Sequence, residues 1–444
     1  MRARSGSGYH REILALSVPA FLTLVAEPLF LLADSAIIGH LGVDELAALG
    51  AAGAVVATAV GLCIFLAYGT TAAVARAAGA GDERAAVRAG VDGSWLAVGV
   101  GVAAVLVLEV AAPWLVGLFG AGEAVAEAAV GYLRIAAFGL PGLLIGLAAT
   151  GILRGFADTR TPLVVTVVTQ ALNVGANLLL VFGLGGWPGL GLLGSAIGSV
   201  GAQTLGGLAF GAVVVRYARD RGVDLRPDRA GVRATGRASV PLIVRTVTLR
   251  TALLLAAVVA GHLGTVALAA HQIAMNVWNL LALALDAVAI AAQTLTGRTL
   301  GAGDASYTRA VVGVMTRWGF VSGVILGVVL AAGHRVIPVL FTTDPQVRTL
   351  LASVLLVAAV WQPVNGIVFV LDGVLIGAGD ATYLARAGML TLVVFVPLAL
   401  LVWGSGVGLA ALWWAFGVFM LSRLVSLVLR ARGDAWLRTG ARLG

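Results

Sequence analysis

Two carboxylates stand inside the first long apolar segment of the chain, and they are the residues whose chemistry most needs an explanation. The segment reads FLTLVAEPLFLLADSAIIGHLG at residues 21–42, with Glu27 and Asp34 in its apolar part. A carboxylate in hydrocarbon costs several kcal/mol, so a membrane protein that keeps one usually uses it. We therefore treat Asp34 and Glu27 as candidate residues for binding a proton or cation.

Neutral oxygen groups are expected at a similar depth in two later apolar segments. Asn173 and Asn177 are four residues apart, which places both on one helix face, and Ser199 follows in the next segment. One ionisable oxygen backed by neutral oxygens suits a proton, and Na⁺ could bind to Asp34 with the two asparagines. The alternative is that Asp34 reaches towards the headgroups while the amides join helices.

Two prolines lie on either side of these residues in the first apolar segment. Pro28 directly follows Glu27, and Pro19 lies about two turns earlier. Proline removes a helix hydrogen bond and clashes with the preceding turn, so it weakens a helix locally. The pattern predicts hinges at both prolines, by which protonation of Asp34 could be coupled to a change of shape; static kinks are the alternative.

The second half of the chain carries a different set of polar residues in its apolar segments. The set consists of Arg245, Asp286 and Asp372, with Arg250 and Asn276 near them. The three at similar depth could form an ion pair or triad that stabilises this half, or part of a substrate path. Both interpretations stay open on the sequence alone.

The elements that must position these residues are membrane-spanning helices. The chain is 60% hydrophobic and 11% charged, with a mean hydropathy of +1.02, which excludes a water-soluble domain of 444 residues. Apolar stretches of about 20 residues recur throughout, long enough to span a bilayer as helices. The pattern predicts an all-α polytopic protein with twelve spans, at residues 12–38, 46–70, 91–112, 128–150, 162–183, 190–216, 238–261, 267–295, 310–332, 349–376, 384–403 and 407–430.

An internal repeat with an offset of 222 residues divides the chain into two halves. GHLGVDELAA at 39–48 returns as GHLGTVALAA at 261–270, and RAAGAGD at 76–82 returns as RTLGAGD at 298–304. Six spans per half give both halves the same orientation, as in transporters built from parallel repeats. We expect an N-terminal lobe at 1–217, a linker at 218–237 and a C-terminal lobe at 238–444. The two lobes should be pseudo-symmetric and arranged as a V.

Arginines orient the spans, since all 29 basic residues are arginine. They concentrate at both termini, in the linker and in alternate loops, which the positive-inside rule places in the cytoplasm. We expect a multi-pass protein of the cytoplasmic (inner) membrane with both termini cytoplasmic. The charge of +8 belongs to these loops and does not indicate a nucleic-acid partner.

The motifs of common enzymes and cofactor sites are absent from the sequence. The three GAGD segments lack a P-loop lysine, and tight helix-joining turns explain them better. We expect no cofactor and no catalytic metal, and a membrane-embedded enzyme is the weakest alternative. A monomer is expected.

Several motifs together resemble the MATE family, the multidrug and toxic compound extrusion transporters, and its DinF-like branch in particular. They are AEPLFLLADSAIIGHLG, AAHQI after the second GHLG, GRTLGAGD, LRGFADTRTP and LDGVLIGAGD. The resemblance implies two six-helix lobes around a cleft, the acidic residue of the first helix at Asp34, and the polar cluster of the fifth and sixth helices at Asn173, Asn177 and Ser199. Some relatives carry a second carboxylate where this chain has Asn177, which favours protons over sodium here.

The resemblance implies a secondary active antiporter. It would export organic, cationic or amphipathic compounds in exchange for H⁺, or for Na⁺, by alternating access of two lobes. Its partners would be a small organic substrate, the coupling ion and the lipid bilayer. The alternative is a flippase for lipid-linked precursors with a related fold, which a large basic cavity would favour.

Overall fold

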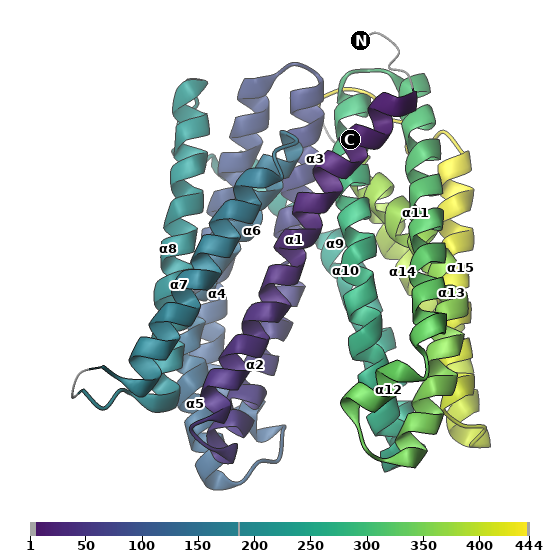
Figure 1. Cartoon of the computed structure of the whole chain (residues 1–444). Helices are drawn as coiled ribbons and strands as arrows, with labels where there is room; N and C mark the ends of the chain where they lie inside the picture. Colours follow the sequence, from purple (N-terminus) through teal and green to yellow (C-terminus); the bar gives the residue numbers. More distant parts are fainter. Residues whose placement is uncertain (1–5, 185–186, 442–444) are drawn as a thin grey trace. The chain divides into compact units, whose positions relative to one another are not determined.

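The computed structural model describes residues 6–184 and 187–441, and over this part of the chain it is helical (Figure 1). The first half contains α1 (Gly6–Gly39), α2 (Val43–Leu62), α3 (Phe65–Gly79), α4 (Glu83–Gly117), α5 (Glu123–Ala137), α6 (Leu140–Gly155), α7 (Arg160–Phe182) and α8 (Gly191–Asp220). The second half contains α9 (Arg229–His262), α10 (Thr265–Gly301), α11 (Ala305–Gly333), α12 (Val336–Phe341), α13 (Pro345–Gly377), α14 (Ala381–Ser405) and α15 (Leu409–Arg432).

The helices confirm an all-α chain with the predicted number of membrane spans. Among the described residues, eleven segments are long and apolar enough to cross a bilayer, and the bent pair α5–α6 makes a twelfth. Most helices continue beyond their predicted limits; α13 has 33 residues. At 1.5 Å per residue such a helix is longer than the hydrocarbon layer, because hydrogen bonding continues into the polar region where hydropathy stops giving a signal.

Two predicted spans are interrupted in the first half of the chain. The span at 46–70 breaks at Cys63 and Ile64, between α2 and α3, and the span at 128–150 bends by 49° between α5 and α6. Gly139 and Pro141 account for the bend, since proline disfavours a helical conformation in the residue before it. The equivalent segments of the second half, within α10 and α13, are continuous.

The helices are packed alike in the two halves, as the repeat predicts. Helices α3, α4 and α8 pack around α6, and α10, α11 and α15 pack in the same way around α13. A Cβ atom on Gly151 would lie 2.6 Å from the carbonyl oxygen of Ala67, and one on Gly373 would lie 2.3 Å from that of Ala289. Both residues of the second pair lie 222 positions after those of the first. The repeat is therefore present in the backbone contacts as well as in the sequence.

The described residues form two compact units whose boundaries lie inside helices. One unit is Leu22–Ser239, and the other consists of the described parts of Met1–Phe21 and Val240–Gly444. The first boundary falls within α1 and the second within α9, each within two residues of a proline, Pro19 and Pro241. The two units thus cross the lobe limits expected from the sequence: the start of α1 belongs with the second half, and the linker belongs with the first.

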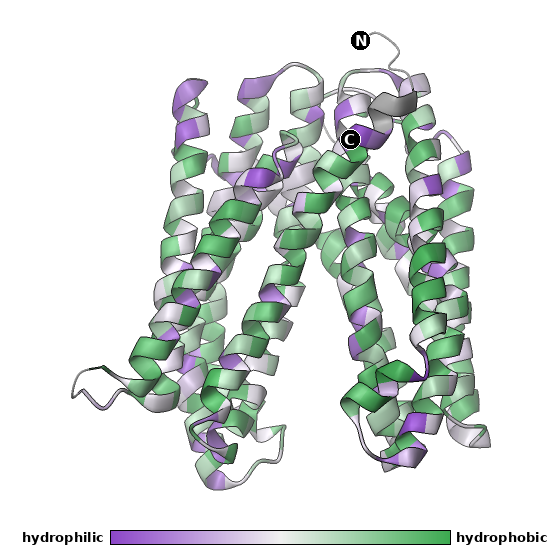
Figure 2. Ribbon diagram, in the orientation of Figure 1, coloured by the Kyte–Doolittle hydropathy of each residue, from purple (hydrophilic) through white to green (hydrophobic). Residues whose placement is uncertain are grey.

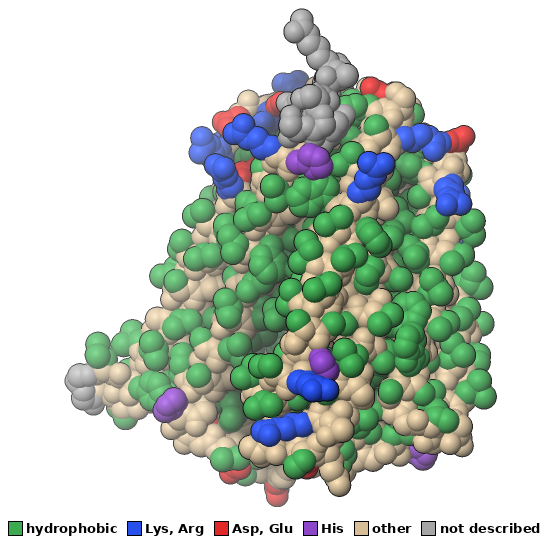
Figure 3. All heavy atoms as spheres, turned by 45° about the vertical axis from the view of Figure 1, so that its right-hand side comes forward, with side chains coloured by type: hydrophobic (Ala, Val, Ile, Leu, Met, Phe, Trp, Pro, Cys, Tyr) green, Lys and Arg blue, Asp and Glu red, His purple; other side chains and the backbone are tan. Residues whose placement is uncertain are grey.

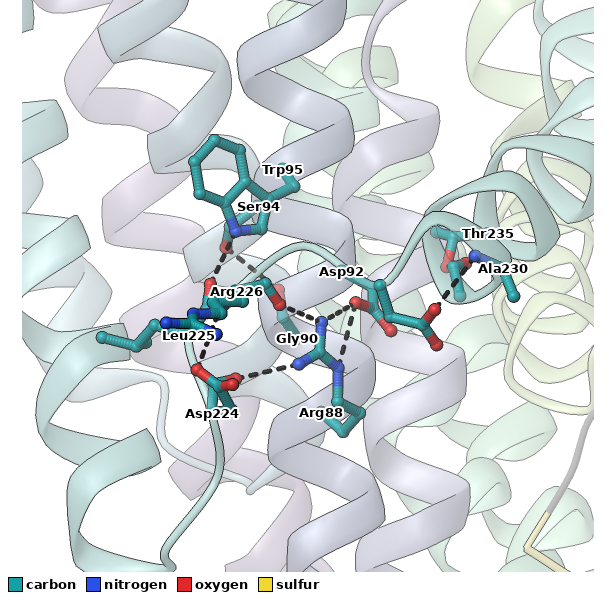
Figure 4. A network of polar contacts seen from close by, with 12 residues as sticks. Arg88, Gly90, Asp92, Ser94, Trp95, Asp224, Leu225, Arg226, Ala230 and Thr235 are labelled. Carbon is teal, nitrogen blue, oxygen red and sulfur yellow. Dashed lines mark hydrogen bonds and ion pairs between the residues drawn. The ribbon is translucent and has the colours of Figure 1, made fainter.

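The linker between α8 and α9 is fastened to α4 (Figure 4). Arg88 donates from Nη1 to the carbonyl oxygen of Asp224, at 2.8 Å, and from Nη2 to that of Arg226, at 2.9 Å. The same guanidinium is paired with Asp92, and Trp95 Nε1 donates to the carbonyl oxygen of Leu225 at 2.8 Å. These bonds satisfy backbone groups of an otherwise irregular segment and explain why the linker belongs to the first unit.

The surface of the helices is that of a protein in lipid. Apolar residues occupy the middle of the helices and polar residues their ends (Figure 2). Large apolar side chains stand exposed along the flanks, for example Val110 at 84%, and charged side chains gather near the helix ends (Figure 3). An exposed apolar surface of this extent is a lipid-facing surface.

The GAGD segments are tight turns between helices. Gly81, Gly303 and Gly379 adopt positive φ angles of 80°, 83° and 77°. Asp304 caps α11 by accepting from the backbone N–H of Tyr307 at 2.9 Å, and this bond lowers the pKa of Asp304 below its ordinary value. The turn interpretation of these segments is therefore correct.

The segment after α15 packs back onto its own unit. Trp436 is 2% exposed, and its Nε1 donates to the carbonyl oxygen of Ala431 at 3.1 Å. The backbone N–H of Gly440 donates to the carbonyl oxygen of Leu300, at the end of α10, at 3.0 Å. This segment therefore covers the end of α10.

Candidate functional site

Asp34 lies near the C-terminal end of α1 and is 4% exposed. Its Oδ1 accepts two hydrogen bonds, from Asn177 Nδ2 at 2.8 Å and from Ser195 Oγ at 2.9 Å. The asparagine comes from α7 and the serine from α8, so three helices of the same unit meet at one carboxylate oxygen. The sequence pattern pointed to Asn177 but not to Ser195.

A second layer of polar groups lies one helical turn away on the same two helices. Ser199 Oγ donates to Asn173 Oδ1 at 3.3 Å. Tyr132 of α5, 6% exposed, brings its hydroxyl within hydrogen-bonding reach of both Ser195 and Ser199. The structure thus gathers the predicted asparagines and serine around Asp34 and adds Ser195 and Tyr132.

Small residues let α7 and α8 approach closely enough to form this site. A Cβ atom on Gly194 would lie 2.3 Å from the carbonyl oxygen of Leu180, and one on Gly198 would lie 2.3 Å from Asn177 Oδ1. Glycine or another small residue at every fourth position is the usual means of close helix packing in a membrane. The Asn177 amide therefore occupies space that any larger residue at 198 would take.

The hydrogen bonds match an ionised carboxylate at Asp34. Both donors point at the same oxygen, and burial otherwise disfavours the charged form. The other polar atom of the Asn177 amide, Oδ1, is buried and accepts no hydrogen bond in the described part of the chain. A neutral carboxyl group has an O–H to donate, and Asn177 Oδ1 is an acceptor within the same site.

The carboxylate and the surrounding oxygens could take up one proton or one small cation. Over the described residues, no three side chains of His, Cys, Asp or Glu are placed to hold a metal ion together. The site therefore has one ionisable group and several neutral ones, as the sequence predicted.

Glu27 and the two prolines are placed differently from Asp34. The Glu27 side chain is exposed on α1, about two turns from Asp34, and does not join the site. Helix α1 runs without a break through Pro19 and Pro28. Hinges at these prolines stay a prediction.

The charged residues of the second unit are only partly brought together. Arg245 Nη2 donates to Asp372 Oδ2 at 2.7 Å, and Arg423 of α15 contacts the same oxygen. Asp286 is half-buried on α10 and does not line the cavity at this cluster. Arg250 and Asn276 are exposed on α9 and α10. Arg423 was not expected, because it lies in the last span, where arginines were assigned to the membrane edge.

Fold and site together define a class: a polytopic helical membrane transporter with an internal repeat and a buried carboxylate in its first half. The model of the MatE family matches residues 19–179 and 241–401 of this chain, two segments of equal length that are 222 positions apart. The chain belongs to the MatE family, whose members are efflux transporters of drugs and toxic compounds and not enzymes.

Relatives extend this result over nearly the whole chain. Protein DETOXIFICATION 44, chloroplastic, of Arabidopsis thaliana is 34% identical over 448 residues, covering 98% of this chain and 82% of the relative. The probable multidrug resistance protein NorM of Thermotoga maritima is 26% identical over 374 residues, covering 83% and 80%. The crystal structure of a Vibrio cholerae MATE transporter in its bent form has a TM-score of 0.86 at 22% identity, covering 97% and 98%, which shows the same fold. The DinF-like branch stays a prediction.

Proposed function

We propose that this protein is a secondary active antiporter that exports organic, cationic or amphipathic compounds in exchange for protons, with Asp34 as the coupling carboxylate. Sodium is the alternative coupling ion. The proposal places the chain in the cytoplasmic membrane with both termini in the cytoplasm, as the distribution of arginines favours.

The observation that carries the proposal is the pair of hydrogen bonds to one oxygen of a buried Asp34. Asn177 and Ser195 stabilise its charged form at 2.8 and 2.9 Å, so deprotonation in a dry site is possible. Protonation removes the charge and weakens both bonds. The new O–H of Asp34 would then be donated to an acceptor such as Asn177 Oδ1, which requires the amide to rotate. A single proton thus changes the bonds between α1 and α7.

The proposed cycle follows from this change. With the site open to the outside, Asp34 takes up a proton, α1 repacks, and the substrate is released. After return to the inward-open state the proton leaves to the cytoplasm. One charge crossing 100 mV supplies about 2.3 kcal/mol, which sustains about a fifty-fold gradient of a neutral substrate.

The test compares Asp34→Asn with Glu27→Gln in vesicles that hold the purified protein and an imposed proton gradient. The probe is ethidium, an aromatic organic cation whose binding and release are measured by fluorescence. Asp34→Asn keeps the size of the side chain and fixes its neutrality, so we expect it to bind ethidium but to lose gradient-driven export. Glu27→Gln should export like the wild type, because Glu27 lies outside the site.

Two results decide between the alternatives. Full export of ethidium by Asp34→Asn would overturn the role of Asp34. Export by the wild type under a sodium gradient at equal pH on both sides, with none under a proton gradient, would assign the coupling to Na⁺.

A further inference from the structure

A small cavity lies within the second unit, between α9, α13, α14 and α15. Its lining includes three charged side chains, Arg245, Asp372 and Arg423, whose side chains are 14%, 8% and 11% exposed. None of them belongs to the Asp34 site, which lies in the other unit. The cavity therefore has chemistry of its own.

The charges that line the cavity do not balance. Both guanidinium groups contact the same oxygen, Asp372 Oδ2, Arg245 at 2.7 Å and Arg423 also through its Nη2. One carboxylate offsets one of the two positive charges, so the lining carries a formal charge of +1. Buried charges are costly unless they are paired, and two guanidiniums that share one oxygen also repel each other. An anion in the cavity would reduce both costs.

Donors for an anion are available at the cavity wall. An arginine side chain has five N–H groups, and each of these arginines gives one nitrogen to Asp372. The hydroxyls of Thr248 and Thr391 also line the cavity, but they donate to the backbone carbonyls of Arg245 and Gly388, at 2.8 and 3.0 Å. The guanidinium N–H groups are therefore the donors for a ligand.

The size of the cavity restricts the ligand. The space is about 10 Å³, room for about one water-sized particle. An organic export substrate cannot enter a space of this size, so the cavity does not suit the substrate path that the sequence left open. A monatomic anion, or at most the carboxylate end of a very small acid, can enter it.

We infer that Arg245 and Arg423 bind one small monovalent anion of the size of chloride, which balances the charge of the cluster and stabilises the second unit. The inference does not depend on the coupling role of Asp34.

The experiment measures the thermal unfolding temperature of the purified protein as chloride replaces gluconate at constant ionic strength and sodium concentration. A ligand that binds the folded state alone raises this temperature in a saturable way, here by a few degrees at tenfold excess over the Kd. We expect Arg423→Gln and Arg245→Gln to lose the chloride-dependent rise. Arg430→Gln is the matched control: it removes an arginine of the same helix, paired with Asp380 instead, and should keep the rise.

Further measurements separate the sources of the anion and secure the test. Formate that raises the unfolding temperature and competes with chloride would extend the site to small carboxylates; formate without effect would restrict it to halides. If the two arginine variants do not fold, bromide in crystals of the wild type replaces them, and anomalous density between Arg245 and Arg423 would support the inference. No saturable rise in the wild type, an equal rise in Arg423→Gln and Arg245→Gln, or bromide crystals without density at this position would overturn it.

Discussion

Replacing Gly198 by alanine should disconnect the Asp34 site without removing any of its polar groups. The added Cβ atom would lie 2.3 Å from Asn177 Oδ1 and 3.3 Å from the Asn177 backbone nitrogen. Ordinary contact begins near 3.4 Å, so the amide must move by about 1 Å. The Asn177–Asp34 hydrogen bond is 2.8 Å long, and a shift of this size would break it.

The magnitude follows from the two effects of the new methyl group. A lost hydrogen bond to a charged group costs about 1.5–3 kcal/mol, which is roughly a ten- to hundred-fold change in an equilibrium that depends on it. Crowding costs about 1–3 kcal/mol in stability, offset by up to about 1 kcal/mol from the better helix propensity of alanine. We therefore expect proton-driven export to fall at least ten-fold, with a modest loss of thermal stability.

Gly201→Ala is the control, because a Cβ atom at Gly201, on the same helix, would have nothing within 4 Å. Both variants are compared in the vesicle export assay and in thermal unfolding. If Gly198→Ala exports as fast as Gly201→Ala, the packing of Asn177 against Gly198 does not position the site, and our reasoning about it is wrong.

Three further outcomes are expected. Ser195→Ala removes a donor to Asp34 and should slow proton-driven export about ten-fold, whereas an unchanged rate would mean that Asn177 suffices. Gly373→Ala places a Cβ atom 2.3 Å from the carbonyl oxygen of Ala289 and should destabilise the second unit by about 1–3 kcal/mol in thermal unfolding; equal stability would show that α10 and α13 can separate freely. Trp436→Ala should cost about 3–5 kcal/mol, because the indole is 2% exposed, and a variant as stable as the wild type would show that the segment after α15 contributes no stability.

Much of the fold was predictable because hydropathy and the repeat report on long segments. The number of spans, the helical class and the offset of 222 residues hold in the structure. The break at Cys63 and Ile64 was not predictable, since the surrounding sequence has no proline and the interruption depends on tertiary packing. The exchange of helix segments between the units was hidden for the same reason: it is a matter of contacts, and the sequence shows only periodicity.

The candidate site was predictable where spacing carried the signal. Asn173 and Asn177 share a helix face, and the structure places both in the core of the site. Ser195 precedes Ser199 by the same four residues, so the identical pattern could have identified it. Tyr132 gave no such signal, because a single tyrosine in an apolar helix is usually a packing residue. Arg423 was missed because hydropathy cannot tell a buried arginine from one that reaches the membrane edge.

The boundary inside α1 has a consequence for the order in which the protein is made. Residues 10–21 pack with the second half of the chain, and His10 Nδ1 accepts a hydrogen bond at 2.8 Å from Trp318 Nε1, 308 residues later. At ribosomal rates of about 5–20 residues per second, this segment waits about 15–60 s for its partner. Residues 223–239 of the first unit are likewise synthesised after the first repeat is complete. A chain cut after Gly222 would give two fragments that each hold a piece of the other unit, so we expect them to assemble together and neither to fold alone.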